Sequence, residues 1–198
     1  MNKKINFKFK GKRDYIHGTD IFRNFINHIN INFDLNKIIN FDMQIKKKTN
    51  FNQLISSKIN EEEEIILNST CEFYFENVKI KLFMIDSKKI VNEYYDYNEN
   101  LFESYILKKK EHELNLRFVD NSNKIDHLID SNKYLLSKIF NYDKWLFTRL
   151  KLYDDKFQNF WNCKNIMIKF TSSILNIFVK TTLVVNDIEV GEIFFYKN

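Results

Sequence analysis

The chain has 198 residues, 44% of them hydrophobic and 16% aromatic, and its formal net charge is +5. This length and apolar content are enough to build one or two hydrophobic cores, and they argue against a disordered chain. Two cysteines are too few for a disulfide framework, and the short, scattered lysine runs argue against nucleic-acid binding.

Patterns that would indicate a membrane segment, a metal site or a nucleotide cofactor are missing from the sequence. The N-terminal stretch MNKKINFKFKGK is basic but lacks the apolar core of a signal peptide, and no apolar run approaches the roughly 20 residues that span a bilayer. The four histidines do not occur in HxxxH or HExxH spacing, and there is no P-loop or GxGxxG sequence. We therefore expect a cytoplasmic protein without membrane contact, metal or cofactor.

The first half of the chain begins with a strand pattern followed by a helix pattern. Residues 5–10 (INFKFK) alternate apolar and polar side chains, which predicts a half-buried strand. Residues 21–29 place their apolar side chains on one helical face, with Thr19 or Asp20 as the expected N-cap.

A β-rich tract and a polar connection come next. Residues 38–48, 63–75 and 77–86 are rich in β-branched and aromatic residues, and Asn77 is expected to form a tight turn between the last two stretches. Residues 92–111 are polar, charged and rich in tyrosine, which indicates a connection with a short helix.

The same order of patterns then starts again. Residues 113–118 alternate like the first expected strand, and residues 125–140 carry apolar side chains at near-helical spacing. Three further β-rich stretches follow, at residues 144–154, 165–185 and 188–197.

This recurrence predicts a duplicated domain rather than a solenoid, because the two copies lie about 110 residues apart. We expect a first repeat over residues 1–91, a connection over residues 92–111 and a second repeat over residues 112–198. The alternative is an unrelated β-rich interaction protein in which the apparent repeat is accidental.

The order of strand, helix and long antiparallel tract resembles the hotdog fold, in which a curved antiparallel sheet wraps one helix. Two copies in one chain resemble the fused double-hotdog arrangement of the thioesterase and dehydratase superfamily. The resemblance implies an α+β fold of two hotdog-like repeats, each with a central helix, that form a pseudo-dimer with a continuous sheet. Because this fold hosts several functions, the site has to be argued from its residues.

A sharper local match lies at Ile16-His17-Gly18-Thr19, directly before the first expected helix. Many hotdog thioesterases carry His-Gly-Gly at this place, and here Thr19 stands where the second glycine would be. The proline-rich loop typical of acyl-carrier-protein dehydratases is absent, because the chain has no proline. The resemblance implies an acyl-CoA or acyl-carrier-protein thioester as substrate, and a thioesterase or a 3-hydroxyacyl dehydratase-like enzyme.

The residues around this match suit thioester chemistry. A helix N-terminus offers unpaired N–H groups and a positive dipole end to a carbonyl oxygen that becomes negative. His17 could act as general base or acid, and Asp20 could orient it or serve as a carboxylate base. Gly18 would let a substrate come close to the backbone. The expected substrate-binding residues are Gly18, Thr19, Tyr15 and Arg13.

The second repeat carries a related but incomplete pattern at His127 and Asp130, so that both copies contain HxxD near a helix start. Leu128 and Ile129 stand in place of the glycine and the threonine of the first copy. We therefore expect the first repeat to hold the site. The second repeat would supply a wall or a residue such as His127, Asp126 or Asp130.

Structural explanations of the same residues stay open. Asp20 could be only a helix cap, His17 only a hydrogen-bonding residue, and Tyr15 only a packing residue. The protein would then be a non-catalytic hotdog that binds an acyl chain or a carrier protein. The oligomeric state also stays open, a homodimer included.

Overall fold

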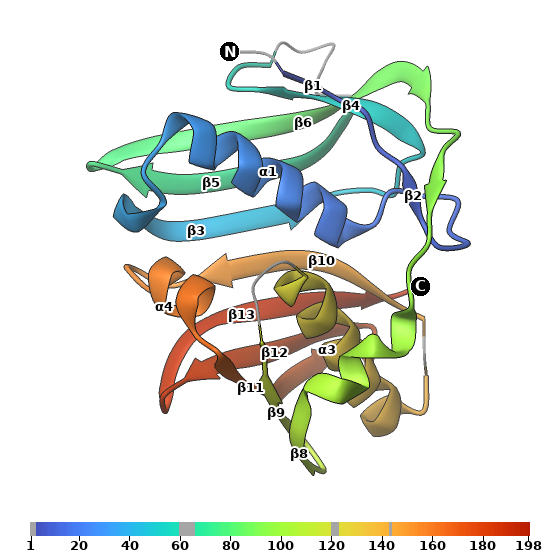
Figure 1. Cartoon of the computed structure of the whole chain (residues 1–198), viewed down its shortest axis with the longest axis vertical. Coiled ribbons are helices and arrows are strands. Elements are labelled where there is room, and N and C mark those ends of the chain that lie inside the picture. Colours follow the sequence, from blue (N-terminus) through green and yellow to red (C-terminus); the bar gives the residue numbers. More distant parts are fainter. Residues whose placement is uncertain (1–2, 60–65, 120–122, 143) are drawn as a thin grey trace. The chain divides into compact units, whose positions relative to one another are not determined.

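The computed structural model describes residues 3–59, 66–119, 123–142 and 144–198 (Figure 1). The chain divides into two compact units, Met1–Asn98 and Glu99–Asn198. Each unit is described by itself below.

The first unit contains one long helix, α1 (Gly18–Asn32), and a five-stranded antiparallel sheet in the order β1-β4-β6-β5-β3. A separate parallel pair joins β2 to β7. The strands are β1 (Lys3–Ile5), β2 (Phe9–Lys10), β3 (Ile38–Ile45), β4 (Phe51–Ser56), β5 (Leu67–Phe75), β6 (Val78–Ile90) and β7 (Tyr94–Tyr95), and a 3-10 turn, η1 (Leu35–Lys37), follows α1.

One face of α1 is apolar and packs in the core of this unit. Phe22, Phe25 and Ile29 recur at helical spacing and are fully buried, and the Phe22 ring meets the ring of Phe41 on β3 edge-on, with 5.9 Å between centroids. The helix stops at Phe33, whose backbone is extended. The expected helix over residues 21–29 is therefore present and is longer at both ends.

Residues 5–10 do not form the single strand expected from their alternation. Between β1 and β2 the backbone N–H of Phe7 donates to the side-chain oxygen of Asn52 at 2.7 Å, which replaces a ladder bond. The alternation was right about the burial of Ile5, Phe7 and Phe9 but not about Lys10, which is fully buried.

The N-cap of α1 and the number of strands in the first unit differ from the prediction, whereas the turn at Asn77 agrees with it. Neither Thr19 nor Asp20 is the N-cap, because both lie inside α1 and the N-cap is His17, whose side chain makes no capping hydrogen bond. Strand β4 was not expected from the sequence. Asn77 does lie in the turn between β5 and β6, where it and Glu76 both have positive φ. Residues 63–65 of the stretch expected from 63 to 75 lie outside the described residues.

The second unit has the long helix α3 (Lys124–Phe140) and an antiparallel sheet in the order β10-β13-β12-β11-β9-β8. Its strands are β8 (Ile106–Lys110), β9 (Glu113–Arg117), β10 (Trp145–Leu152), β11 (Asn165–Ile174), β12 (Phe178–Val185) and β13 (Ile188–Lys197). A 3-10 segment, η2 (Glu99–Tyr105), precedes β8, and a short helix, α4 (Phe157–Asn162), joins β10 to β11. The short helix expected within residues 92–111 is thus η2.

The β-rich run over residues 165–185 is a hairpin rather than one strand. Leu175 and Asn176 have φ of 53° and 54° and lie in the connection of residues 175–177 between β11 and β12. Asn186 and Asp187 have φ of 51° and 62° and connect β12 to β13. Two successive residues with positive φ are typical of two-residue hairpin turns, and this chain builds them without glycine.

Helix α3 is fixed to its sheet by apolar packing and by one buried polar contact. Leu128, Ile129 and Leu136 are fully buried, and the side-chain amide of Asn132 donates to the hydroxyl of Thr181 on β12 at 2.6 Å. A buried amide needs such a partner, so this contact also fixes how α3 lies along β12.

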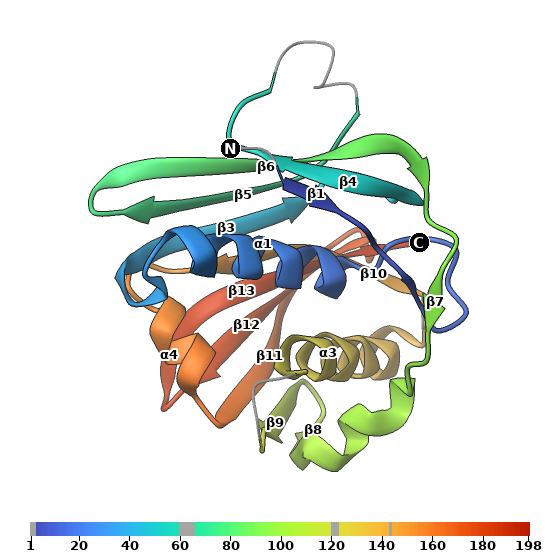
Figure 2. The same ribbon diagram turned by 45° about the horizontal axis from the view of Figure 1, so that its top comes forward.

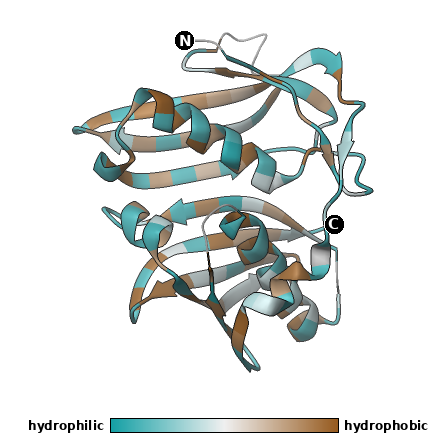
Figure 3. Ribbon diagram, viewed as in Figure 1, coloured by the Kyte–Doolittle hydropathy of each residue, from teal (hydrophilic) through white to brown (hydrophobic). Residues whose placement is uncertain are grey.

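Each unit is therefore one long helix packed against an antiparallel sheet (Figures 1 and 2). Hydrophobic and hydrophilic residues alternate along the strands, as expected for sheets with one covered face (Figure 3). The expected α+β class with two hotdog-like repeats is confirmed. In the described part of the chain, no helix is long and apolar enough to cross a membrane.

Helix α4 was not expected from the sequence, and its C-terminal end is held by a buried lysine. The side chain of Lys124 is 3% exposed, and Nζ donates to the carbonyl oxygens of Phe160, Trp161 and Cys163 at 2.6, 3.0 and 2.6 Å. A cation at the C-terminal end of a helix also meets the negative end of the helix dipole. Burial lowers the pKa of Lys124.

Replacing Lys124 with methionine should destabilise the protein, because the side-chain volume is kept while the donors to three carbonyl groups are lost. We expect the free energy of unfolding to fall by about 2–4 kcal/mol in urea titrations followed by circular dichroism. The matched control is Lys138→Met on the exposed face of the same helix, which should change stability by less than about 0.5 kcal/mol. Equal stability of the two variants would contradict this role of Lys124.

Replacing Gly191 with alanine should also destabilise the protein, because β13 approaches β10 too closely there for a side chain. A Cβ atom on Gly191 would lie 2.3 Å from the carbonyl oxygen of Lys151 and 2.8 Å from Cδ2 of Leu152. We expect a loss of about 1–3 kcal/mol in the same urea titration. Glu189→Ala, on an exposed position of the same strand, is the control, and an unchanged midpoint for Gly191→Ala would show that the strands can separate without cost.

Candidate functional site

The candidate site of the first unit is centred on His17, the residue that directly precedes α1. Its side chain is 2% exposed, and Nδ1 lies 2.8 Å from the hydroxyl oxygen of Thr19 in the first turn. Gly18 is the first helical residue, and the first two backbone hydrogen bonds of the helix run to the carbonyl oxygen of His17. The imidazole is thus fixed where the positive end of the helix dipole lies.

A fully buried lysine completes this cluster. Nζ of Lys10 lies 3.5 Å from the hydroxyl oxygen of Thr19 and 3.5 Å from the centroid of the Tyr97 ring. The parallel β2–β7 pair brings Lys10 and the tyrosine-rich segment together, and the turn after β2 uses Gly11 with φ of 61°. An aromatic face is one of the few uncharged surroundings that stabilise a buried ammonium group. We call Lys10, His17, Thr19 and Tyr97 the histidine cluster.

The proton of a neutral His17 ring can lie on either nitrogen. An ammonium group can only donate, so the Thr19 hydroxyl oxygen accepts from Lys10, and the same oxygen lies 2.8 Å from Nδ1 of His17. Where the Thr19 hydroxyl donates its own proton to Nδ1, the ring proton is on Nε2, and Nε2–H is a hydrogen-bond donor.

Asp20 belongs to a different set of contacts. Its Oδ1 accepts from the hydroxyl of Tyr95 at 2.9 Å and from the guanidinium of Arg23, one turn along α1. Arg23 also lies 3.3 Å from the Tyr95 hydroxyl. An acidic residue in the first turn is favourable for the helix, and charge-assisted hydrogen bonds strengthen it further. We call Asp20, Arg23 and Tyr95 the aspartate triad.

Two other predicted residues are half-buried beside these clusters. Arg13 donates to the carbonyl oxygen of Lys10 at 3.3 Å, and the ring of Tyr15 lies 5.1 Å from Nζ of Lys48. The structure thus brings His17 and Thr19 together and places Asp20 in contact with Arg23 and Tyr95. Lys10 was not predicted from the sequence, because strict alternation from Phe7 and Phe9 would put its side chain on the solvent side.

The second HxxD pattern is not at a helix start. His127 is the fourth residue of α3, whereas His17 precedes α1, so the two patterns differ by about one helical turn. The His127 ring is buried and stacks on Tyr105, with 4.4 Å between centroids. Asp126 and Asp130 are buried in the same helix. Both histidines therefore lie near a helix start, but His127 lies about one turn further into its helix than His17.

Among residues 3–59, 66–119, 123–142 and 144–198, no group of three or more His, Cys, Asp or Glu side chains is placed to hold a metal ion. Two surface cavities of about 260 and 280 Å³ lie in the second unit, and neither is lined by a predicted site residue.

Comparisons with known proteins give structural similarity without sequence similarity. No protein-family model matches the chain, and no curated protein sequence matches it. Among solved structures, it is similar to the dehydratase domain of PpsC from Mycobacterium tuberculosis in complex with C12:1-CoA (6% identity, TM-score 0.49, covering 98% of this chain and 92% of that one). It is similar to a TesB protein from Mycobacterium avium subspecies paratuberculosis (6% identity, TM-score 0.47, 96% and 90%). It is also similar to an N-terminal dehydratase from the difficidin assembly line (8% identity, TM-score 0.43, 100% and 93%).

The aspartate triad predicts an energetic coupling between Tyr95 and Asp20. Tyr95→Phe removes one hydrogen bond to the carboxylate, and in a double-mutant cycle with Asp20→Asn we expect a coupling of about 1 kcal/mol in the free energy of unfolding. Tyr94→Phe is the matched control, because the neighbouring hydroxyl makes no hydrogen bond in the described structure, and its coupling to Asp20→Asn should be near zero. Similar couplings for both tyrosines would contradict the triad.

Proposed function

We propose that this protein acts on acyl thioesters at the histidine cluster, as a thioesterase or a dehydratase-like enzyme. The observation that carries the proposal is the placement of the His17 imidazole at the N-terminal end of a 15-residue helix, with Nδ1 fixed by the hydroxyl of Thr19. The substrate class is an acyl thioester of coenzyme A or of an acyl carrier protein.

In the proposed reaction His17 polarises the thioester carbonyl. Nε2–H donates to the carbonyl oxygen, whose negative charge grows as the reaction proceeds, and the helix dipole adds to this stabilisation. Lys10 contributes its positive charge through Thr19 and keeps the donor orientation of the ring. In this proposal His17 is a donor in its resting state, whereas the sequence left base and acid roles both open.

The proposal assigns Asp20 a positioning role and not that of the base. Its carboxylate oxygen Oδ1 accepts from Arg23 and Tyr95, and these contacts hold it between α1 and β7. Hydrolysis and dehydration both gain from a polarised carbonyl, so the donor role of His17 is common to the two reactions.

The second candidate function is binding without turnover, and two observations favour it. The side chain of His17 is 2% exposed, and Asp20 is held in the aspartate triad rather than presented as a base. In this case the first unit would bind an acyl chain or an acyl carrier protein, and the polar contacts around α1 would stabilise the helix.

Turnover of a substrate panel by wild type and by His17→Ala separates these functions. Purified protein is supplied with acyl-CoA and acyl-carrier-protein thioesters of different chain lengths, and thiol release and enoyl absorbance are followed. For the proposed enzyme we expect kcat/KM of His17→Ala to fall at least about 100-fold, as for loss of a positioned proton donor. The matched control is His28→Gln, which alters another buried histidine of α1 and should retain activity.

Two other outcomes would contradict the proposed site or the proposed enzymatic function. Full activity of His17→Ala would contradict the proposed site, even if the protein is an enzyme. Saturable binding of an acyl thioester without turnover by the wild type would replace the enzymatic function with the binding function.

A further inference from the structure

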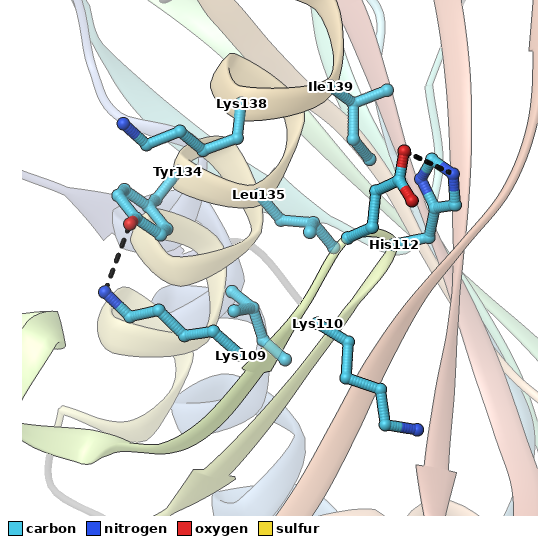
Figure 4. A pocket seen from close by; sticks show the side chains of 9 residues that line it. Lys109, Lys110, His112, Tyr134, Leu135, Lys138 and Ile139 are labelled. Atoms are coloured by element: carbon cyan, nitrogen blue, oxygen red, sulfur yellow. Dashed lines mark hydrogen bonds and ion pairs between the residues drawn. The ribbon is translucent and has the colours of Figure 1, made fainter.

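Three lysines of the second unit line a cavity of about 260 Å³ (Figure 4). The cavity lies between the β8–β9 hairpin and helix α3, and we call it the hairpin pocket. Its lining comes from the hairpin (Lys109, Lys110, Glu111, His112 and Leu114) and from the helix (Tyr134, Leu135, Lys138 and Ile139). The one carboxylate of this lining, on Glu111, lies 3.8 Å from Nε2 of His112.

Two of the three lysines of the hairpin pocket meet at one tyrosine. Nζ of Lys109 donates to the hydroxyl oxygen of Tyr134 at 3.1 Å and lies 4.7 Å from the ring centroid. Nζ of Lys138 lies 5.4 Å from the same centroid. Figure 4 shows the amino groups of Lys109 and Lys138 near Tyr134, while Lys110 points away from them.

The two lysines at Tyr134 lack acidic partners, whereas the third lysine has one. Nζ of Lys110 lies 2.6 Å from the carboxylate of Glu113. Within the part of the chain that the structure describes, neither Lys109 nor Lys138 has a carboxylate oxygen within 4.0 Å. Two ammonium groups held around one ring repel each other, and a bound anion removes that repulsion.

The hairpin pocket also offers a neutral donor and an apolar surface. The Tyr134 hydroxyl oxygen accepts from Lys109, so its own proton can be donated to a ligand. The buried side chain of Leu135 lies between the helix and the hairpin. Two cations and one hydroxyl match an anion with several oxygen atoms and a double negative charge, and a phosphate monoester has both.

We propose that the hairpin pocket binds a small phosphate monoester, with its phosphate between Lys109, Lys138 and the Tyr134 hydroxyl. The organic part of the ligand lies against the apolar lining of the pocket, which Leu114, Leu135 and Ile139 form. A cavity of about 260 Å³ admits a group the size of a phosphorylated ring. This site uses residues of the second unit only, so it goes beyond the proposed function and shares no residue with the histidine cluster.

Isothermal titration calorimetry on the full chain at low salt tests the proposal, with phenyl phosphate as the probe. We expect saturable binding at one site, weakened about fivefold or more by Lys109→Gln and by Lys138→Gln. Lys110→Gln is the matched control, because it removes a neighbouring lysine that is paired with Glu113, and it should change the affinity less than about twofold. Circular dichroism verifies that all three variants, altered at exposed side chains, remain folded.

Inorganic phosphate and benzoate separate the contributions of the two parts of the ligand. Both should bind at least about threefold more weakly than phenyl phosphate, because one lacks the ring and the other lacks the second charge. The proposal is overturned by three results: no saturable binding of phenyl phosphate, equal weakening by Lys110→Gln and Lys109→Gln, or inorganic phosphate or benzoate binding as tightly as phenyl phosphate.

Discussion

The burial of one helical face against an antiparallel sheet is the constraint on which each unit depends. In the first unit Phe22, Phe25 and Ile29 contribute to that burial, and each buried side chain of this size is worth about 1.5–3 kcal/mol. The position of α1 follows from this packing, and so does the place where the helix begins. His17 is held at the helix start because the apolar residues behind it fix the helix, and the polar contacts then set the direction of the ring.

The two long helices could be predicted from the sequence, because the spacing of their apolar residues repeats within a few positions. Helical spacing over residues 21–29 and 125–140 predicted α1 and α3, since an amphipathic face repeats within a few residues. Strand β4 was not predicted from the sequence, because its residues Asn52 and Gln53 are polar and yet buried. Their side chains bond to the backbone of Phe7 and to Asp86, which are distant in the chain. Burial of this kind depends on partners that no local pattern reveals.

In the candidate site too, contacts between residues close in the chain could be predicted, and contacts between distant residues could not. The proximity of His17 and Thr19 was predictable, because they are two residues apart at a helix start. The contribution of Lys10 was not, because it depends on a parallel pairing of two two-residue strands more than 80 residues apart. The tyrosine-rich segment was noted only as a connection, yet Tyr95 and Tyr97 supply the partners of Asp20 and Lys10.

The lysines of the outermost strands have a consequence for the behaviour of the protein in solution. Strand β8, with Lys108, Lys109 and Lys110, ends the sheet of the second unit, and β1, with Lys3 and Lys4, ends that of the first. A strand at the end of a sheet carries unpaired backbone groups that can recruit a strand from another molecule, and lysine side chains oppose such recruitment. The run of lysines that gives the hairpin pocket its charge therefore also protects a chain rich in isoleucine and phenylalanine from edge-to-edge aggregation.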